Sequence, residues 1–194
     1  ADEINRAPPK TQAALLEVMQ ERQITIEGES FSLAPPFVVL ATQNPLDQEG
    51  TYPLPEAELD RFLFKILIGY PEQEDEARML RMVLDGTLAD SLDDAGLSAV
   101  TDSAGVLSLS RWAEQVLLDD AILDYLLRLA RATRDPPALV QGASPRASIA
   151  LARAAKSYAL LDGRDFVIPD DIKAVAPPVL RHRLRLGVDA ELEG

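Results

Sequence analysis

The 194-residue sequence contains no cysteine and only one histidine, His182. Without cysteine the chain can form no disulfide, no thiol nucleophile and no thiolate zinc site, and a single histidine argues against a histidine-based metal centre. Chains without disulfides are typical of reducing compartments, so we expect a cytoplasmic protein. These absences exclude the small disulfide scaffolds and the cysteine-dependent enzymes.

Long apolar runs and excess positive charge are also lacking. No apolar run approaches the roughly 20 residues of a membrane-spanning helix, and no basic start precedes an apolar stretch, so we expect neither membrane insertion nor a signal peptide. The formal net charge is −13, which would repel nucleic acid phosphates, so we expect no nucleic acid partner. The chain does have 47% hydrophobic residues, enough to build a core.

Two parts of the chain differ in their hydrophobic pattern. In residues 1–71 short helical and strand patterns alternate, and the apolar stretches at 37–43 and 62–70 are typical of buried strands in a parallel sheet. From residue 72 to 194 nearly every periodic segment is helical, apart from a small, acidic stretch at 85–105 that predicts a surface loop. We therefore expect part of an α/β core over 1–71, followed by an all-α domain over 72–194.

Single residues and short patterns predict individual helices and turns within these two parts. Pro8 and Pro9 precede a helical pattern, at positions where the missing amide hydrogen costs little. Apolar residues then alternate on both sides of Glu27-Gly28, which predicts a hairpin turning there. A short helix is expected over 55–62. Trp112 lies in an amphipathic pattern and is expected in the core of the helical domain.

The first polar group that could carry chemistry is Asp2-Glu3, at the end of a presumed strand. Ligands of open α/β sheets bind at the carboxyl ends of parallel strands, and Mg²⁺ takes oxygen ligands. One carboxylate could hold the ion's water shell while the other orients an attacking water. Taken alone, an acidic pair is more often a solvated surface feature.

The second group is Thr42-Gln43-Asn44-Pro45, at the tip of the apolar stretch that ends at residue 41. A side-chain amide at that position can donate to a phosphate or fix a water. The alternative is a simple turn, because Asn-Pro is a common turn dipeptide.

Two arginines form the third and fourth candidates. Arg61 ends the short helix, where it could neutralise charge on a transferring phosphoryl group across a subunit boundary; a pair with Glu58 or Glu56, or a solvated side chain, is the alternative. Arg146 follows Ser144, a predicted helix cap. A cation there opposes the helix dipole and suggests that an anion approaches, although chance placement explains it equally well.

Taken in order, these stretches resemble the MoxR family of AAA+ ATPases. The resemblance rests on DEINRAPPKTQAALLEVMQE from residue 2, the ITIEGESF hairpin, ATQNPLDQEGTYPLPEAELDRF from residue 41, GYP and GASPRAS from residue 142. It covers nearly the whole chain and is weakest at 85–105. Together and in the family's order, these stretches are far more specific than any one of them.

The resemblance implies a role for each candidate, with ATP and Mg²⁺ as the cofactors. Asp2 corresponds to the Walker B aspartate that holds Mg²⁺ through water, and Glu3 to the carboxylate that polarises the lytic water. Asn44 would be sensor 1, which positions that water. Arg61 is similar to the arginine finger, acting on a neighbouring subunit's nucleotide. Arg146 would be sensor 2 on the lid, with action in cis or in trans left open.

The resemblance also implies an assembly and a task. Such proteins form ring homo-oligomers, generally hexamers, and remodel or activate client proteins, often with partners that carry von Willebrand factor A domains. A member has a Walker A loop, G-x-x-x-x-G-K-[ST], which does not occur in these 194 residues. We therefore expect residue 1 to fall inside the Walker B strand of a longer ATPase, and the chain alone to be inactive.

Two other functions compete with this one. The chain could be a stand-alone, non-catalytic module whose helices bind a protein partner, a reading favoured by the absent phosphate loop and the acidity. It could also belong to a nucleic-acid motor, because ring helicases share the hairpin before sensor 1. The net charge of −13 counts against the motor.

Overall fold

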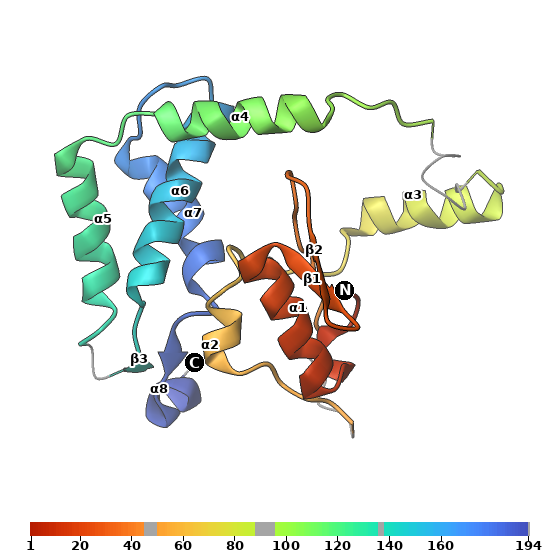
Figure 1. The fold of residues 1–194 in the computed structure, drawn as a ribbon, viewed down its shortest axis with the longest axis horizontal. Helices are drawn as coiled ribbons and strands as arrows, with labels where there is room; N and C mark the ends of the chain where they lie inside the picture. Colours follow the sequence, from red (N-terminus) through yellow and green to blue (C-terminus); the bar gives the residue numbers. More distant parts are fainter. Residues whose placement is uncertain (45–49, 88–95, 136–137, 194) are drawn as a thin grey trace.

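The computed structural model describes residues 1–44, 50–87, 96–135 and 138–193, and Figure 1 shows their arrangement. The helices are a 3₁₀ turn (Ile4–Arg6), α1 (Pro9–Glu21), α2 (Glu56–Leu59), α3 (Gln73–Leu84), α4 (Ser103–Gln115), α5 (Asp120–Ala132), α6 (Pro145–Leu161), α7 (Pro169–Leu180) and α8 (Val188–Glu193). The strands are β1 (Gln23–Ile26), β2 (Glu29–Ser32), β3 (Leu139–Gln141) and β4 (Arg185–Leu186). None of the helices in the described ranges is long and apolar enough to cross a membrane.

The predicted helix and hairpin near the start of the chain are both confirmed. Pro9 is the first residue of α1, and Leu16 of that helix is buried. Strands β1 and β2 pair antiparallel, with Ile24 opposite Phe31. Glu27 and Gly28 between them have φ angles of 52° and 87°, the left-handed backbone that a tight two-residue hairpin turn requires.

The apolar stretches 37–43 and 62–70 differ from their prediction as buried strands. Neither belongs to a sheet of the described chain, and Leu40 and Ile68 are 80% and 92% exposed. Residue 1 does lie alongside residues 40–42 in the manner of a parallel pair, because the nitrogen of Ala1 donates to the Leu40 carbonyl at 2.7 Å and the Thr42 amide donates to the Ala1 carbonyl at 2.9 Å. A buried parallel strand needs neighbours along both edges and cover on both faces, and the described residues supply neither in full.

The core of the described structure lies between α5, α6 and α7, with α6 in the middle (Figure 1). Leu126, Leu151 and Ile172, one from each helix, are completely buried. The face of α6 toward its neighbours consists largely of alanines, which let the helices approach closely; the buried ones are Ala147, Ala150, Ala154, Ala155 and Ala159. The side chains of Asp119 and Ser144 accept backbone amides at the starts of α5 and α6, as N-caps do.

Helix α4 crosses one end of this bundle, at the top of Figure 1, and packs against α6. Because only part of α4 is covered there, Trp112 is 56% exposed, and its prediction as a core residue is wrong. Helix α4 also begins at Ser103, inside the stretch 85–105 predicted as a loop; residues 88–95 of that stretch lie outside the described ranges.

The connection between α6 and α7 is fixed by a buried ion pair. Asp171 is 1% exposed and accepts two hydrogen bonds from Arg164, at 2.8 and 2.5 Å, and one from the Ile168 amide at 2.8 Å. The bonds from Arg164 lower the pKa of the Asp171 carboxyl, although burial acts in the opposite direction. Asp171 thus holds the start of α7 and the preceding turn together.

Candidate functional site

The carboxylates predicted at the end of a strand lie where two chain segments run side by side. Thr42 joins them: its hydroxyl donates to the Asp2 carboxylate at 2.5 Å and accepts the Glu3 amide at 2.8 Å. The Thr42 carbonyl also accepts the amide of Ile4 at 2.9 Å. One threonine therefore sets the position of both acidic residues, a role that its motif alone did not reveal.

Glu3 has an unusual backbone. Its φ and ψ of 44° and 54° are left-handed, which costs a non-glycine residue roughly 1–2 kcal/mol. Its carboxylate lies 3.1 Å from Nε of Arg6, and both side chains are partly exposed. Strain of this kind persists only where the surroundings fix the backbone, here the hydrogen bonds from residues 3 and 4 to Thr42.

Two buried side-chain amides hold this turn, and one of them connects it to Asn44. Asn5 is 8% exposed and Gln12 of α1 is 3% exposed. The Asn5 side chain donates to the Asn44 carbonyl at 3.0 Å, and Gln12 donates to the carbonyls of Ile4 and Tyr52 at 3.1 and 2.8 Å. The side-chain oxygen of Asn5 is buried and has no partner within the described ranges. Sequence reasoning missed both residues. Gln12 could have been found, because it stands one turn before the buried Leu16 on the same side of α1, whereas no pattern in the sequence marks Asn5.

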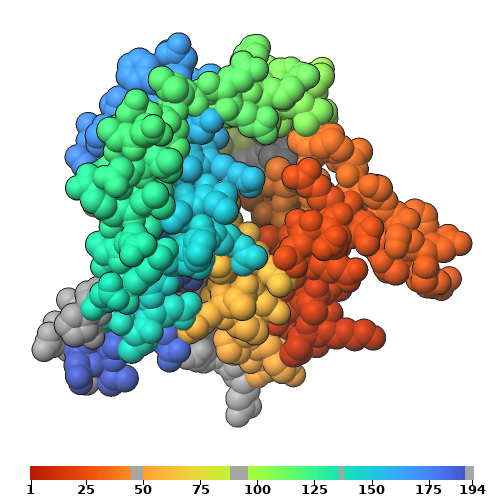
Figure 2. All heavy atoms as spheres, turned by 60° about the vertical axis from the view of Figure 1, so that its left-hand side comes forward, coloured from red at the N-terminus to blue at the C-terminus, as the bar shows by residue number. Residues whose placement is uncertain are grey.

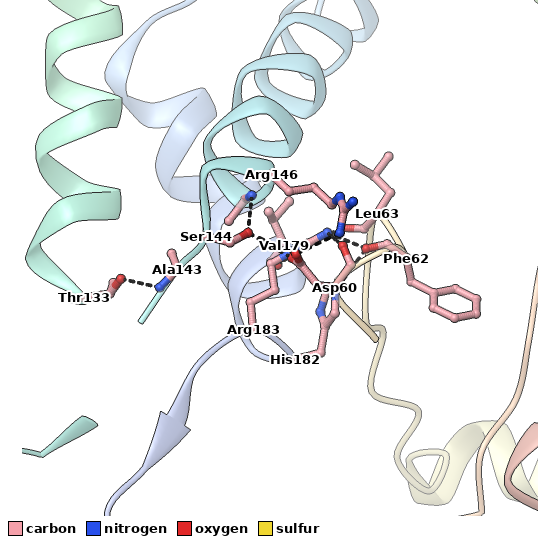
Figure 3. A network of polar contacts seen from close by, with 11 residues as sticks. Asp60, Phe62, Leu63, Thr133, Ala143, Ser144, Arg146, Val179, His182 and Arg183 are labelled. Carbon is pink, nitrogen blue, oxygen red and sulfur yellow. Dashed lines mark hydrogen bonds and ion pairs between the residues drawn. The ribbon is translucent and has the colours of Figure 1, made fainter. Parts of the chain in front are cut away.

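A second polar centre forms around Asp60, directly after α2 (Figure 3). Its carboxylate accepts hydrogen bonds from Arg183 at 2.8 Å, Ser144 at 3.0 Å and Arg146 at 3.2 Å. Burial on its own would raise the pKa of Asp60, but the bonds from Arg183 and Ser144 and the two positive charges outweigh it and keep that pKa below its ordinary value. The α2 segment is thereby tied to the first turn of α6.

Arg183 is the most enclosed charged group of this centre, with 4% of the residue exposed. Besides the Asp60 carboxylate it donates to the carbonyls of Asp60 at 2.9 Å, Phe62 at 2.6 Å and Leu63 at 3.1 Å, and to that of Val179. Burial lowers the pKa of the Arg183 guanidinium, and the bond to Asp60 acts against this. Figure 3 shows the guanidinium in the middle of these acceptors.

Arg61 follows Asp60 but does not join its network. Its Nε is buried and has no hydrogen-bond partner in the described part of the chain. Glu56, one of the partners considered from the sequence, pairs instead with Arg185 at 2.9 Å. The other, Glu58, has a buried carboxylate oxygen that likewise lacks a described partner. The intrahelical pair that the sequence allowed is therefore not formed in this structure.

A cavity of about 210 Å³ adjoins the Asp60 centre. Its lining includes Asp60, Ser144, Arg183 and the backbone at Gly142. Gly142 is required by a close approach, because a Cβ there would lie 2.3 Å from the Thr133 carbonyl oxygen. Thr133, at the end of α5, also accepts the Ala143 amide at 2.9 Å, so the lead into α6 is held against α5. Figure 2 shows α5 and the start of α6 in front, beside the α2 segment.

The predicted site residues therefore fall into two groups. Asp2, Glu3 and Asn44 lie together at the paired segments 1–4 and 40–44, whereas Arg61 and Arg146 adjoin Asp60. Within the described ranges no hydrogen bond or ion pair joins the two groups, and no group of three or more potential metal ligands is present. The exposed Asp2 carboxylate still fits Mg²⁺, which keeps most of its water and takes one or two protein carboxylates.

Sequence comparisons match the two ends of the chain to two profiles. Residues 1–64 match the ATPase family associated with various cellular activities (AAA), and residues 131–194 match the AAA lid domain. The first range contains Asp2, Glu3, Asn44 and Arg61, and the second contains Arg146. All five predicted site residues thus lie in matched regions.

Individual proteins match over the whole chain. The chain is 47% identical to the uncharacterized protein YeaC of Bacillus subtilis, over 100% of this chain and 59% of that protein, and 48% identical to the chaperone MoxR1 of Mycobacterium tuberculosis, over 98% and 51%. A crystal structure of a protein from Cytophaga hutchinsonii superimposes with a TM-score of 0.91 at 42% identity, over 100% of this chain and 60% of that one. The predicted fold class is thereby confirmed, and the chain spans little more than half the length of these relatives.

Proposed function

Because this chain belongs to the MoxR family of AAA+ ATPases, we propose that it supplies the Walker B, sensor and lid residues of an ATP-hydrolysing protein. The observation that carries the proposal is the pairing of residues 1 and 40–42, which brings Asp2 and Glu3 to within two residues of Asn44 along the neighbouring segment. ATPase chemistry needs a metal-holding carboxylate, a water-polarising carboxylate and a water-positioning amide in one place.

In this proposal each residue at the segment ends has one task. The Asp2 carboxylate, fixed by Thr42, holds the water shell of Mg²⁺, which neutralises charge on the phosphates when it is bound. The Glu3 carboxylate accepts a hydrogen bond from the attacking water and takes its proton as the water oxygen bonds to the γ-phosphorus of ATP. The bond between that phosphorus and the bridging oxygen breaks in the same displacement, and ADP leaves with that oxygen. The Asn44 side-chain amide orients the same water. One Glu3 carboxylate oxygen pairs with Arg6 in this structure, and the other can accept the hydrogen bond from this water.

The two arginines act on the charge that develops at the γ-phosphate. Arg61 serves a neighbouring subunit's nucleotide in a ring homo-oligomer, a hexamer, which is supported by its place apart from Asp2 and Glu3. Arg146 lies in the first turn of α6 and exchanges Asp60 for a phosphate oxygen. The proposal divides the chain at residues 71 and 72, into a part of the nucleotide-binding core and a helical lid.

The wider proposal concerns the whole protein. The activity requires a phosphate-binding loop, which these 194 residues do not contain, so we propose that they are inactive alone. The protein remodels or activates client proteins in the cytoplasm, with partners that carry a von Willebrand factor A domain. Support comes from its similarity to MoxR1, which is named a chaperone, and from the family resemblance.

The test is the ATPase rate of the full-length protein with Mg²⁺. Glu3→Gln keeps the size of the side chain but removes the proton acceptor, and we expect hydrolysis to fall at least about 100-fold, the usual contribution of a general base. Nucleotide binding, followed with a fluorescent ATP analogue, should persist. Glu17→Gln, on the exposed side of α1, is the matched control and should leave the rate unchanged. Equal activity of the two variants would contradict the proposal.

A further inference from the structure

Arg183 makes an unusually complete set of contacts. A guanidinium carries five N–H donors, and all five are used: one on the Asp60 carboxylate, one on the Val179 carbonyl, and three on the carbonyls of Asp60, Phe62 and Leu63. Four of the five therefore end on residues 60–63. This arginine was assigned no role from the sequence, because it stands in a run, LRHRLR, that resembles a basic helix end.

The chemistry of these contacts requires arginine in particular. A planar guanidinium can reach several fixed acceptors at once, whereas a lysine ammonium has three donors on one nitrogen. Burying the charge is unfavourable unless it is paired and its donors are satisfied, and both conditions are met here. The result is a rigid clamp on the backbone of residues 60–63 rather than a surface ion pair.

The clamped residues are those on either side of Arg61. Arg183 binds the carbonyls of Asp60 and Phe62, the residues immediately before and after it, while the Nε of Arg61 makes no described hydrogen bond. His182 adds a hydrogen bond of 3.0 Å to the same Phe62 carbonyl. The backbone that carries Arg61 is fixed, whereas no hydrogen bond or ion pair among the described residues holds its side chain.

We infer that Arg183 is a positioning residue for Arg61, and that through it the helical lid sets where that arginine points. This inference rests on the proposed function, in which Arg61 acts on a neighbouring subunit's nucleotide. Arg183 follows α7 directly and remains bonded to Val179 of that helix. The Asp60 carboxylate also holds Ser144 and Arg146 at the start of α6. A movement of α6 and α7 must therefore carry residues 60–63 with it.

The test uses mixed rings of full-length subunits. Glu3→Gln disables the subunit's own site but leaves its Arg61 able to serve a neighbour. Arg61→Ala leaves the subunit's own site intact but removes the arginine that it offers to a neighbour. Arg183→Lys keeps a positive charge near Asp60 but cannot reach all the carbonyls. Rings made of Arg183→Lys alone should hydrolyse ATP about 100-fold more slowly than the unmutated protein, the effect of misplacing a catalytic group by about 1 Å.

The pattern of recovery on mixing separates positioning from damage. Arg183→Lys mixed with Glu3→Gln should recover a substantial part of the activity, because the arginine of the latter serves the intact site of the former. Mixed with Arg61→Ala it should stay inactive, since neither subunit offers a well-placed Arg61. A subunit that is merely damaged would recover with neither partner. Arg185→Gln, which removes only the exposed pair with Glu56, is the matched control. It should hydrolyse ATP at the unmutated rate alone and stay active when it is mixed with either partner.

The other possible results would overturn either the role of Arg183 or the proposed function. Recovery of Arg183→Lys with Arg61→Ala, or a normal rate for Arg183→Lys alone, would overturn the inference. If Arg183→Lys does not enter rings by gel filtration, Arg183→Met, which buries no charge, replaces it. If neither folds, Arg183 is needed for the fold itself and the inference is wrong. If Glu3→Gln and Arg61→Ala fail to recover with each other, the proposed function fails first.

Discussion

Replacing Asp171 with alanine should destabilise the helical part of the chain by about 3 kcal/mol. Removing one partner of a buried ion pair typically costs about 3–5 kcal/mol, and Asp171 is 1% exposed with three hydrogen bonds. The lower end applies because Arg164 keeps its bonds to Asp162 and to the Phe166 carbonyl. The loss includes about 1 kcal/mol for the Ile168 amide that Asp171 satisfies at the start of α7.

The assay is thermal and urea unfolding followed by circular dichroism. For a chain of this size about 3 kcal/mol corresponds to a fall in Tm of roughly 6–12 °C. Asp170→Ala is the matched control. Asp170 precedes Asp171 in the sequence, but it is exposed and pairs with Lys173 at 3.0 Å on the surface, so we expect the free energy of unfolding to change by less than about 0.5 kcal/mol. A loss below about 1 kcal/mol for Asp171→Ala, or equal losses for both variants, would refute the reasoning.

Three further predictions follow from the same contacts. Gly142→Ala should lower the free energy of unfolding by about 1–3 kcal/mol, as overpacking does, because its Cβ would meet the Thr133 carbonyl at 2.3 Å. Gly163→Ala has open space around its Cβ but a φ of 76°, so its free energy of unfolding should fall by about 1 kcal/mol. Urea unfolding of the two variants measures both losses. The pKa values of Asp60 and Asp171 are lowered in the folded protein. The two carboxylates therefore stabilise the fold above the ordinary pKa near 4, and this stabilisation is lost as the pH falls through the lowered values. Unfolding measured between pH 5 and 2 should show the loss, and the loss should be smaller in Asp171→Asn. Thr42→Val should cut the ATPase rate about 10–100-fold, as loss of a residue that orients metal-binding groups does, with little change in Tm; an unaltered rate would show that Thr42 does not orient Asp2 and Glu3.

Local signals predicted much of the fold. The helix at Pro9, the turn at Glu27-Gly28 and the cap at Ser144 depend on backbone preferences of single residues, and each is present in the structure. The buried strands at 37–43 and 62–70 were predicted from continuous apolar runs. Such runs show that a segment prefers to be covered, but the cover itself comes from other segments, and the described residues leave Leu40 and Ile68 exposed.

The candidate site was predictable in part for a similar reason. Asp2 and Glu3 were predicted at the end of a presumed strand and Asn44 at the tip of the apolar stretch that ends at residue 41, and the family resemblance implied that the three act together. Arg183 could not be found this way, because three of its four hydrogen bonds to residues 60–63 end on backbone carbonyls about 120 residues away, and only one ends on the Asp60 carboxylate. Every residue has a backbone carbonyl, so the sequence does not show which carbonyls accept a hydrogen bond. It also does not distinguish a buried arginine from one at the surface.

The most direct test of the central claim is the ATPase rate of full-length Glu3→Gln and Arg61→Ala subunits, mixed in equal amounts after each is shown to be inactive alone. If the active site is built from Glu3 of one subunit and Arg61 of its neighbour, the mixture recovers a substantial fraction of the unmutated rate, and the fraction varies with the mixing ratio. A mixture that stays as inactive as its components, although gel filtration shows mixed rings, would contradict the account.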